Sequence, residues 1–343
     1  MKKVKTILFA SVIASLLVGC SNKEKVDPAN ADDPALVEEP VVTYQAPFSG
    51  EQLEQQVTNR PVLVTINNQV EARPQSGLSS ADVVYEMLSE GDVTRLLALF
   101  QTEIPESVGP IRSARSYFID VAQGLDAFYI AHGYSPEAKS MLENRVVDNI
   151  NGMAYDGSLF IRSKDRVAPH NSYMPGDNIE KSMETVGAST LYSKKVSYSF
   201  YNEQESVKIG ESATTVNVKY SYMDSFNSTY KFSESTGTYE RSNGNSVTTD
   251  LLTGEPLAIT NVLFLDMQHN IVDSDGRRDI DITSGGVAYV AQQGGIRQVE
   301  WANKDGLLVA IEADGSPVKL VPGLTWVHFV PASPGVLSSV TYK

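Results

Sequence analysis

The chain has 343 residues, of which 41% are hydrophobic and 20% charged, so it holds ample apolar material for a large packed core. Its 42 acidic residues outnumber the 28 basic ones, and the resulting net charge of −14 argues against nucleic acid as a main partner, because a phosphate backbone needs a basic face. A single cysteine excludes a disulfide framework, a multi-cysteine zinc site and an iron–sulfur cluster. The four histidines show no metal-ligand spacing and no phosphate loop or dinucleotide fingerprint is present, so we expect neither a metal nor a cofactor.

Residues 1–19 have the pattern of a secretory signal peptide. Three early lysines precede an apolar run, Ile7 to Val18, that is too short for a stable membrane span. The run ends in Leu17-Val18-Gly19-Cys20, which resembles the lipidation signal of bacterial lipoprotein precursors. We predict cleavage before Cys20 and acylation of its thiol, which would anchor the protein on the extracytoplasmic face of the cell membrane. An uncleaved N-terminal anchor with an incidental cysteine is the alternative.

Cleavage would also change the charge of the protein. It removes three lysines and no acidic residue, so the net charge of −14 becomes −17. A strongly anionic protein is repelled by an anionic membrane surface, so bare lipid headgroups are expected to be a poor ligand. The next segment, residues 20–48, combines the lipidated Cys20 with an acidic, proline-rich stretch that we interpret as a disordered tether.

Residues 49–188 are predicted to form a mixed α/β domain. Pro61 to Ile66 is typical of a buried strand, and Ser79 to Asp82 is expected to begin a short helix, with Asp82 acting as in a capping box. Val83 to Ser89 and Val93 to Gln101 indicate two strands joined by a tight turn at Gly91-Asp92.

Two helices and a strand should complete this domain. Ser113 to Leu125 has apolar residues at helical spacing, and Ala127 to Ala131 is typical of a short strand. Ser135-Pro136-Glu137 indicates a helix N-terminus, with Ser135 as the N-cap and the helix continuing to about Asn144.

Residues 189–343 are predicted to form a mostly-β domain. Apolar and polar residues alternate in Val196 to Phe200 and in Val216 to Tyr220, and glycine-containing turns recur at Asn243-Gly244, Asp275-Gly276 and Gly294-Gly295. The expected fold class is therefore α+β, an N-terminal mixed α/β domain followed by a mostly-β domain.

Arginine is strongly concentrated in the first of these regions. Between residues 50 and 180 there are only two lysines but eight arginines, at positions 60, 73, 95, 112, 115, 145, 162 and 166. Arginine is preferred where a planar fork grips a carboxylate or phosphate, or where a charge must persist while partly buried. Arg112 and Arg115 flank the start of a predicted helix, where positive charge is unfavourable unless an anion shares that helix end. That anion could be a ligand, or Glu86 or Glu90 within an internal network, and both interpretations remain open.

The candidate catalytic groups are weaker. Ala131 to Pro136 superficially suggests a nucleophile elbow, but Pro136 has no backbone N–H to serve as an oxyanion donor, so an N-cap is the better interpretation of Ser135. His170 follows Arg162 and Arg166 closely and could bind a ligand or move a proton. Asp82, Glu86 and Glu90 could supply paired carboxylates for glycan hydrolysis. No residue is assigned a catalytic role.

Several segments resemble the YerB-like lipoprotein family, whose folded part is known as domain of unknown function 3048. They include Glu71 to Leu78, Ala81 to Glu86, Glu90 to Arg95, Val108 to Arg115 and Ala168 to Asn171, with further pieces at Asp275 to Arg277, Gly294 to Trp301 and Pro322 to Trp326. The resemblance covers nearly all of the chain after the tether. It implies two adjoining domains and a lipid-anchored envelope protein, commonly of Gram-positive bacteria, with no agreed activity and no catalytic residue to transfer. It draws attention to Arg73, Glu86, Glu90, Arg95, Arg112, Arg115, His170 and Asn171.

Three functional hypotheses follow. The first is a non-enzymatic module in which the arginines, Arg162 and Arg166 included, bind an anionic envelope component or a cell-wall synthesis protein. The second is a cell-wall-modifying hydrolase that uses Glu86 or Glu90 with His170. The third is a solute-binding receptor. The sequence leaves the oligomeric state open.

Overall fold

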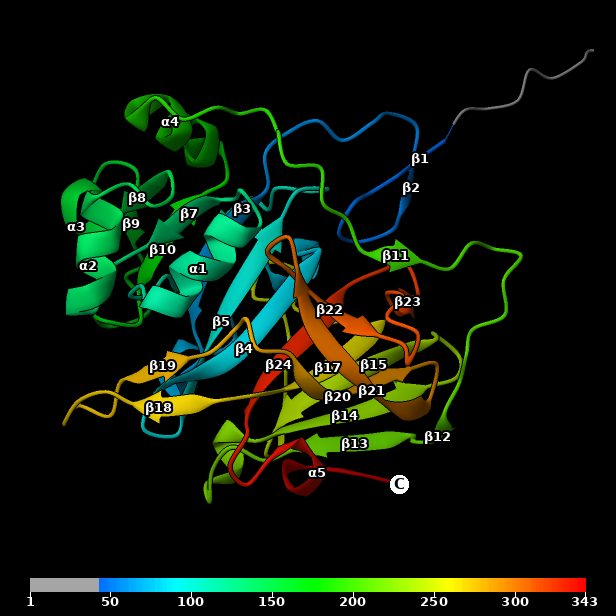
Figure 1. Ribbon diagram of the computed structural model, residues 1–343. Coiled ribbons are helices and arrows are strands. Elements are labelled where there is room, and N and C mark those ends of the chain that lie inside the picture. Colours follow the sequence, from blue (N-terminus) through cyan, green and yellow to red (C-terminus); the bar gives the residue numbers. More distant parts are fainter. Residues whose placement is uncertain (1–42) are drawn as a thin grey trace, which may run out of the picture. The chain divides into compact units, whose positions relative to one another are not determined.

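A computed structural model describes residues 43–343, which are mostly β with few helices (Figure 1). This agrees with the predicted α+β class at a coarse level. The predicted signal peptide, Cys20 and most of the predicted tether lie outside the described residues. Within them, no helix is long and apolar enough to cross a membrane.

One large sheet crosses both predicted regions of the chain. Its order is β12-β21-β20-β17-β24-β4-β5-β3-β7-β8, with β22 paired to β21. The strands are β3 (Val62–Asn67), β4 (Val83–Glu90), β5 (Val93–Phe100), β7 (Phe128–Ala131), β8 (Asn149–Asn151), β12 (Glu211–Ser212), β17 (Asn261–Met267), β20 (Gly286–Gln292), β21 (Gly295–Lys304), β22 (Leu307–Ile311) and β24 (Thr325–Pro331). The two regions join where β24 pairs in parallel with β4, with Thr325 opposite Val83 and His328 opposite Glu86. Strands from both sides of the predicted domain boundary at residue 188 therefore share this sheet.

Smaller sheets and short helices cover the large one. A five-stranded sheet has the order β16-β15-β14-β13-β25, a three-stranded sheet has the order β6-β10-β9, and β1-β2, β11-β23 and β18-β19 are pairs. Their strands are β1 (Tyr44–Gln45), β2 (Gln52–Leu53), β6 (Ser107–Val108), β9 (Ile161–Arg162), β10 (Ser172–Pro175), β11 (Ser199–Phe200), β13 (Thr215–Val218), β14 (Ser228–Ser233), β15 (Thr238–Asn243), β16 (Ser246–Val247), β18 (His269–Ile271), β19 (Arg278–Ile280), β23 (Lys319–Leu320) and β25 (Val340–Tyr342). The helices are α1 (Ser116–Gly124), α2 (Pro136–Glu143), α3 (Gly152–Tyr155), α4 (Asp177–Val186) and α5 (Val336–Ser339), and the 3₁₀ helices are Val70–Ala72, Leu78–Ser80 and Asp224–Phe226. Helices α1 to α4 gather around β7 and β8, whereas α5 lies beside β13 (Figure 1).

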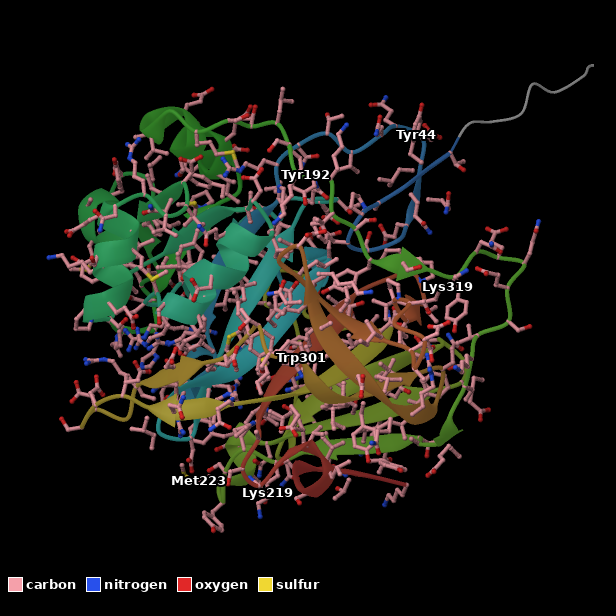
Figure 2. All side chains as sticks on the ribbon, in the orientation of Figure 1. Tyr44, Tyr192, Lys219, Met223, Trp301 and Lys319 are labelled. Atoms are coloured by element: carbon pink, nitrogen blue, oxygen red, sulfur yellow. The ribbon has the colours of Figure 1, made fainter. Side chains whose placement is uncertain are left out.

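The central strands of the large sheet, from β17 to β7 in the sheet order, are buried on both faces, whereas β21 has exposed residues. Alternate residues of β4 and β5 enter two hydrophobic clusters: Tyr85 and Leu97 pack with α1 in one, and Val84 and Leu96 pack with the five-stranded sheet in the other. Continuous apolar runs such as Val62 to Ile66 are expected when neither face of a strand meets water. Trp301 lies well inside the molecule and is 1% exposed, whereas Met223 lies at its edge and is 55% exposed (Figure 2).

Most local predictions in the first region are confirmed. The strand at β3, the β4–β5 hairpin around Gly91 and the helices α1 and α2 all form. Gly91 has a φ of +54°, which a glycine adopts without strain. Ser135 caps α2, because its Oγ accepts a hydrogen bond from the backbone N–H of Ala138 at 3.3 Å.

Three local predictions are wrong. Asp82 does not cap a helix; its carboxylate accepts hydrogen bonds from the backbone N–H groups of Gln101 and Thr102, so a tertiary contact replaces the local one. Only Ser199 and Phe200 of the predicted strand at Val196 to Phe200 pair with a neighbour. The last residues of the predicted tether are folded, because β1 is paired with β2 and Phe48 is completely buried.

Candidate anion-binding site

Glu90, at the end of β4, is shared by two buried arginines. Arg95 of β5 donates to its carboxylate from Nη2, at 2.9 Å from Oε2, and Arg115, the residue that precedes α1, contacts Oε1. The Arg95 and Arg115 side chains are 6% and 5% exposed, whereas that of Glu90 is 30% exposed. Arg95 also donates to the carbonyl of Ser113 at 2.7 Å, which fixes its direction. Glu90 therefore supplies an internal anion beside the start of α1.

Arg112 lies near Arg95 but has no acidic partner of its own among the described residues. Its backbone is held between β3 and the end of β7, because its N–H donates to Thr65 and its carbonyl accepts from His132, each at 2.9 Å. Among residues 43–343, no carboxylate oxygen lies within 4.0 Å of its guanidinium, and that guanidinium makes no hydrogen bond. Burial and the nearby charge of Arg95 lower the pKa of Arg112 to about 10, so the group stays charged at neutral pH.

Further donors in this area lack acceptors. The buried Nε of Arg115 has no hydrogen-bond partner in the described part of the chain, nor has the buried Nε of Arg278. Arg278 belongs to β19, and its Nη2 donates to the carbonyl of Gly91 at 2.8 Å, in the hairpin turn that follows Glu90. Within the same residues, the backbone N–H groups of Ser116 and Tyr117 at the start of α1 also donate to no acceptor. Positive charge and unused donors therefore gather at one place, which is the electrostatic requirement for an anion site.

A separate network of polar side chains connects Asp156, Arg162, His132 and Ser172. Arg162 forms an ion pair with Asp156 at 2.9 Å and donates from Nη2 to His132 Nε2 at 3.0 Å. A guanidinium has no acceptor, so Nε2 must carry the lone pair, and Nδ1–H donates to Ser172 Oγ at 2.7 Å. Burial and the charge of Arg162 lower the pKa of His132. In this tautomer His132 cannot accept a proton from Ser172, so the pair lacks the geometry of an activated serine.

Arg73 and Arg166 bind backbone rather than acids. Arg73 donates to the carbonyls of Asn68 and Ser225, and Arg166 donates to the carbonyls of Ala72 and Pro74. These contacts hold the loop after β3 against later parts of the chain. Their charges are not neutralised, but their donors are in use.

His170 and Asn171 have structural contacts. The amide oxygen of Asn67 accepts from the backbone N–H of Gln69, so its Nδ2 faces His170 Nδ1 at 3.0 Å and donates to it. Asn171 accepts from Arg162 and donates to the carbonyls of Ser163 and Arg166. The structure therefore brings Arg162 and Asn171 together, whereas His170 binds the end of β3.

Glu86 lies in a different place from Glu90. It is completely buried and forms an ion pair with Arg241 of β15, whose Nη2 lies 2.8 Å from Oε2. Trp326 Nε1, Thr94 Oγ1 and Asn68 Nδ2 also donate to this carboxylate. A carboxylate so enclosed has no access to a polymeric substrate. Sequence reasoning missed Arg241 and Arg278, which are recruited from 155 and 187 residues further along the chain by contacts that no local pattern encodes.

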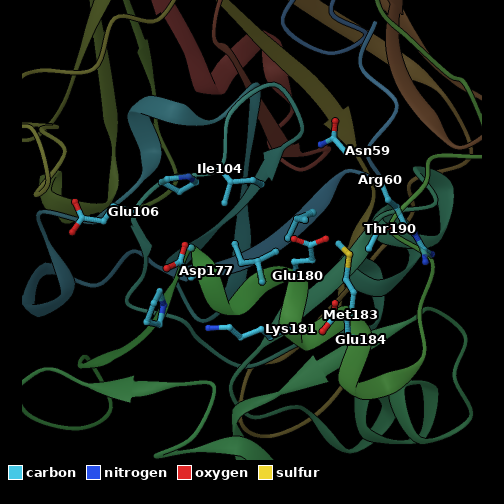
Figure 3. A pocket seen from close by; sticks show the side chains of 15 residues that line it. Asn59, Arg60, Ile104, Glu106, Asp177, Glu180, Lys181, Met183, Glu184 and Thr190 are labelled. Carbon is cyan, nitrogen blue, oxygen red and sulfur yellow. The ribbon is translucent and has the colours of Figure 1, made fainter. Parts of the chain in front are cut away.

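A cavity of about 830 Å³ lies elsewhere, beside α4 (Figure 3). Its apolar lining includes Ile104 and Met183, and its rim carries four acids, Glu106, Asp177, Glu180 and Glu184, against one lysine, Lys181. Arg60, which also lines it, is neutralised by Asp126 and Asp148 at 2.9 and 2.7 Å. None of Arg95, Arg112, Arg115 or Arg162 lines this cavity, and its acidic rim is the opposite of what an anion requires.

Comparison with known proteins places the chain in a family whose function is unknown. The model of the DUF3048 N-terminal domain matches residues 48–189, and that of the DUF3048 C-terminal domain matches residues 216–327. Together the matches cover most of the chain, which therefore belongs to the DUF3048 family.

A relative of known sequence and structure is similar over nearly the full length. The Bacillus subtilis (strain 168) protein named "Putative lipoprotein YerB" is 39% identical over 333 residues, which are 96% of each chain. The crystal structure of the YerB protein from Bacillus subtilis matches with a TM-score of 0.80 at 40% identity, over 88% of this chain and 99% of that one.

Proposed function

We propose that the protein is a lipid-anchored cell-envelope protein whose first region binds an anionic group of an envelope component at Arg112. The lipid anchor is supported by the cysteine at the end of the apolar leader and by the name of the Bacillus subtilis relative. Acyl chains on Cys20 would hold the protein at the extracytoplasmic face of the membrane. The folded part would then meet wall polymers or the surfaces of other envelope proteins.

One observation carries the binding proposal. Arg112 is a half-buried guanidinium with no acidic partner among residues 43–343, and the neighbouring Arg95 already shares Glu90 with Arg115. Partial burial of an unpaired charge costs free energy, and an incoming anion would offset that cost. Arginines that already pair with acids of the chain, as Arg60 does with Asp126 and Asp148, have no unpaired charge for a ligand to neutralise.

The test is a set of calorimetric titrations on the complete chain at low ionic strength. The probes are acetate, dimethyl phosphate and glycerol phosphate, and the variants are Arg112→Gln and Lys208→Gln. Lys208 is an exposed surface residue paired with Glu312, so its substitution removes the same charge at another place. We expect at least one probe to bind the wild type and Lys208→Gln equally, and to bind Arg112→Gln at least about 10-fold more weakly, the value of a charge-assisted hydrogen bond. Equal binding by Arg112→Gln, or no binding of any probe to the wild type, would refute the proposal.

The hydrolase hypothesis has weaker support. Glu86 is enclosed by Arg241 and Trp326, Glu90 is engaged by Arg95 and Arg115, and His170 accepts from Asn67. Glu86 and Glu90 are four residues apart on one strand, roughly 13 Å at ~3.3 Å per residue, beyond the usual separation of glycosidase carboxylates.

The solute-receptor hypothesis has one observation in its favour. The cavity beside α4 has the size of a small-molecule site, and its acidic rim suits a cationic solute rather than an anionic one.

A further inference from the structure

The anion site has an excess positive charge that can be counted. Arg95, Arg112 and Arg115 contribute three guanidinium charges, and Glu90 contributes one carboxylate within salt-bridge distance of two of them. The adjoining β18–β19 hairpin adds Arg277 and Arg278 but also Asp273 and Asp275, which both pair with Arg277 at 2.7 Å, and Asp279, which lies near Asp120 of α1, so that the hairpin itself carries a net charge of −1. Glu90 and these three arginines by themselves therefore carry an excess of two positive charges, within a chain whose net charge is strongly negative.

Hydrogen-bond donors without acceptors also indicate which kind of anion would fit the site. Arg115 is 4% exposed, yet its Nε has no acceptor, and Arg112 makes no side-chain hydrogen bond within the described part of the chain. The free N–H groups at the start of α1 lie at the same helix end, because Arg115 is its N-cap. An acceptor with three or more oxygens can use donors from several directions, whereas a carboxylate offers only two oxygens.

We propose that the group bound here is a dianionic phosphoryl group, such as a terminal phosphate monoester on an envelope component. This inference rests on the proposed function, because it names the chemical class of the anion at the same site. A phosphate monoester carries close to two negative charges at neutral pH and matches the excess of two, while a carboxylate or a phosphate diester carries one. Glu90 would remain in place to position Arg95 and Arg115, which would make it a positioning residue.

The charged groups around the site determine whether the affinity for an anion should rise or fall with pH. They are Glu90 and Arg95 of the β4–β5 hairpin, Arg112, Arg115, Tyr117 and Asp120 in and before α1, Tyr129 and His132 at β7, Arg162 of β9, and Asp273, Asp275, Arg277, Arg278 and Asp279 of the β18–β19 hairpin. As pH rises from 5 to 7.5, every protein group that titrates loses positive or gains negative charge, and each such change weakens anion binding. An affinity that increases over this interval must therefore come from the second ionisation of the ligand, near a pKa of about 6.

The experiment compares glycerol phosphate with dimethyl phosphate, a diester that keeps one charge throughout, by calorimetry on the complete chain at pH 5 and pH 7.5. We expect the affinity for glycerol phosphate to increase at least about 5-fold with pH, and to exceed that for dimethyl phosphate and acetate at pH 7.5. The preference should be lost in Arg112→Gln and kept in Lys208→Gln.

The outcomes separate the two proposals. If dimethyl phosphate or acetate binds at Arg112 as tightly as glycerol phosphate, with no increase between the two pH values, the phosphoryl assignment is wrong and the proposed anion site stands. If no probe binds, or if Arg112→Gln binds them all as the wild type does, both proposals fail. Binding of glycerol phosphate that strengthens with pH and depends on Arg112 would support both.

Discussion

Arg241 and Arg112 illustrate two opposite uses of a guanidinium in this protein. Arg241 is completely buried against Glu86 and stacks on Trp326, with its Cζ 4.6 Å from the ring centroid. Arg112 is half-buried, and in the described part of the chain no acid pairs with it. The first arrangement stabilises the fold from within, and the second leaves a charge that an external group can neutralise.

The buried pair supports a stability prediction. Burial by itself would raise the pKa of Glu86, but the charge of Arg241 and hydrogen bonds from Thr94 and Trp326 outweigh it, and the pKa is lowered. Glu86→Gln leaves the Arg241 charge without a counter-ion, so we expect a loss of about 3–5 kcal/mol in the free energy of unfolding, measured by urea denaturation. Glu300→Gln, at an exposed position of β21, is the control and should change stability by less than about 0.5 kcal/mol.

The Glu86–Arg241 pair also predicts how the free energy of unfolding depends on pH. A carboxyl whose folded pKa lies below its unfolded value stabilises the fold above that unfolded value, about 4.5, and loses this contribution as pH falls through the folded pKa. The destabilisation caused by Glu86→Gln should therefore shrink below pH 4. A destabilisation that stays constant from pH 7 to pH 3 would contradict the assigned ionisation.

At the residue scale, the sequence indicated the arginine concentration but not the partner of each arginine. Glu90 was one of two acids considered as an internal anion at the start of α1, and in the structure it pairs with Arg115 there. Arg278 and Arg241 come from strands far along the chain, so only the tertiary fold reveals them.

At the scale of elements, three carboxylates from α1, α2 and β19 face one another. Burial, followed by repulsion from Glu137 and Asp279, raises the pKa of Asp120 to about 6. A carboxyl whose folded pKa is above its unfolded value of 3.8 destabilises the fold once it is charged in both states, that is, above pH 6.

Asp120→Asn should therefore stabilise the protein at pH 7 by on the order of 1 kcal/mol, a value reduced for the exposed part of the side chain. The gain should vanish below pH 4, and thermal unfolding at pH 3.5 and pH 7 measures it. Asp279→Asn should give a smaller gain, since it removes only one repelling charge. No pH dependence in the gain would show that Asp120 is not repelled in this way.

Elements with local signals were predictable, and elements set by tertiary contacts were not. The turn at Gly91 and the cap at Ser135 depend on a few adjacent residues, and both form as predicted. Asp82 fitted a capping box equally well, but two backbone N–H groups of the β5 end bind it instead. A local sequence pattern cannot determine whether a side chain such as Asp82 caps a nearby helix or binds a distant backbone N–H group.

At the scale of the whole molecule, β24 joins the two regions. It lies between β17 and β4, parallel to both, and Glu86 reaches across to Arg241 and Trp326. The alternating pattern of the second region predicted strands but gave no means of predicting that one from residues 325–331 would insert beside one from residues 83–90. Pairing at such a sequence separation depends on burial of both faces of the sheet rather than on local propensity.

This junction predicts cooperative unfolding. Because the shared sheet and the buried ion pair belong to both regions, neither can lose its structure without exposing the core of the other. Differential scanning calorimetry of the complete chain should show a single transition whose calorimetric and van't Hoff enthalpies agree. Two resolved transitions would indicate that residues 49–188 and 189–343 unfold independently.

Arg112 and its neighbours are expected to meet an anion from outside the molecule. The most direct measurement is NMR of the arginine side chains, with ¹⁵N label at Nε, during titration of the complete chain with glycerol phosphate. We predict saturable shifts of the Nε–H signals of Arg112, Arg95 and Arg115, with those of the internally paired Arg60 and Arg241 unmoved. An Arg112 signal that stays fixed while phosphate is added, or equal unsaturable drifts of all arginine signals, would contradict the account.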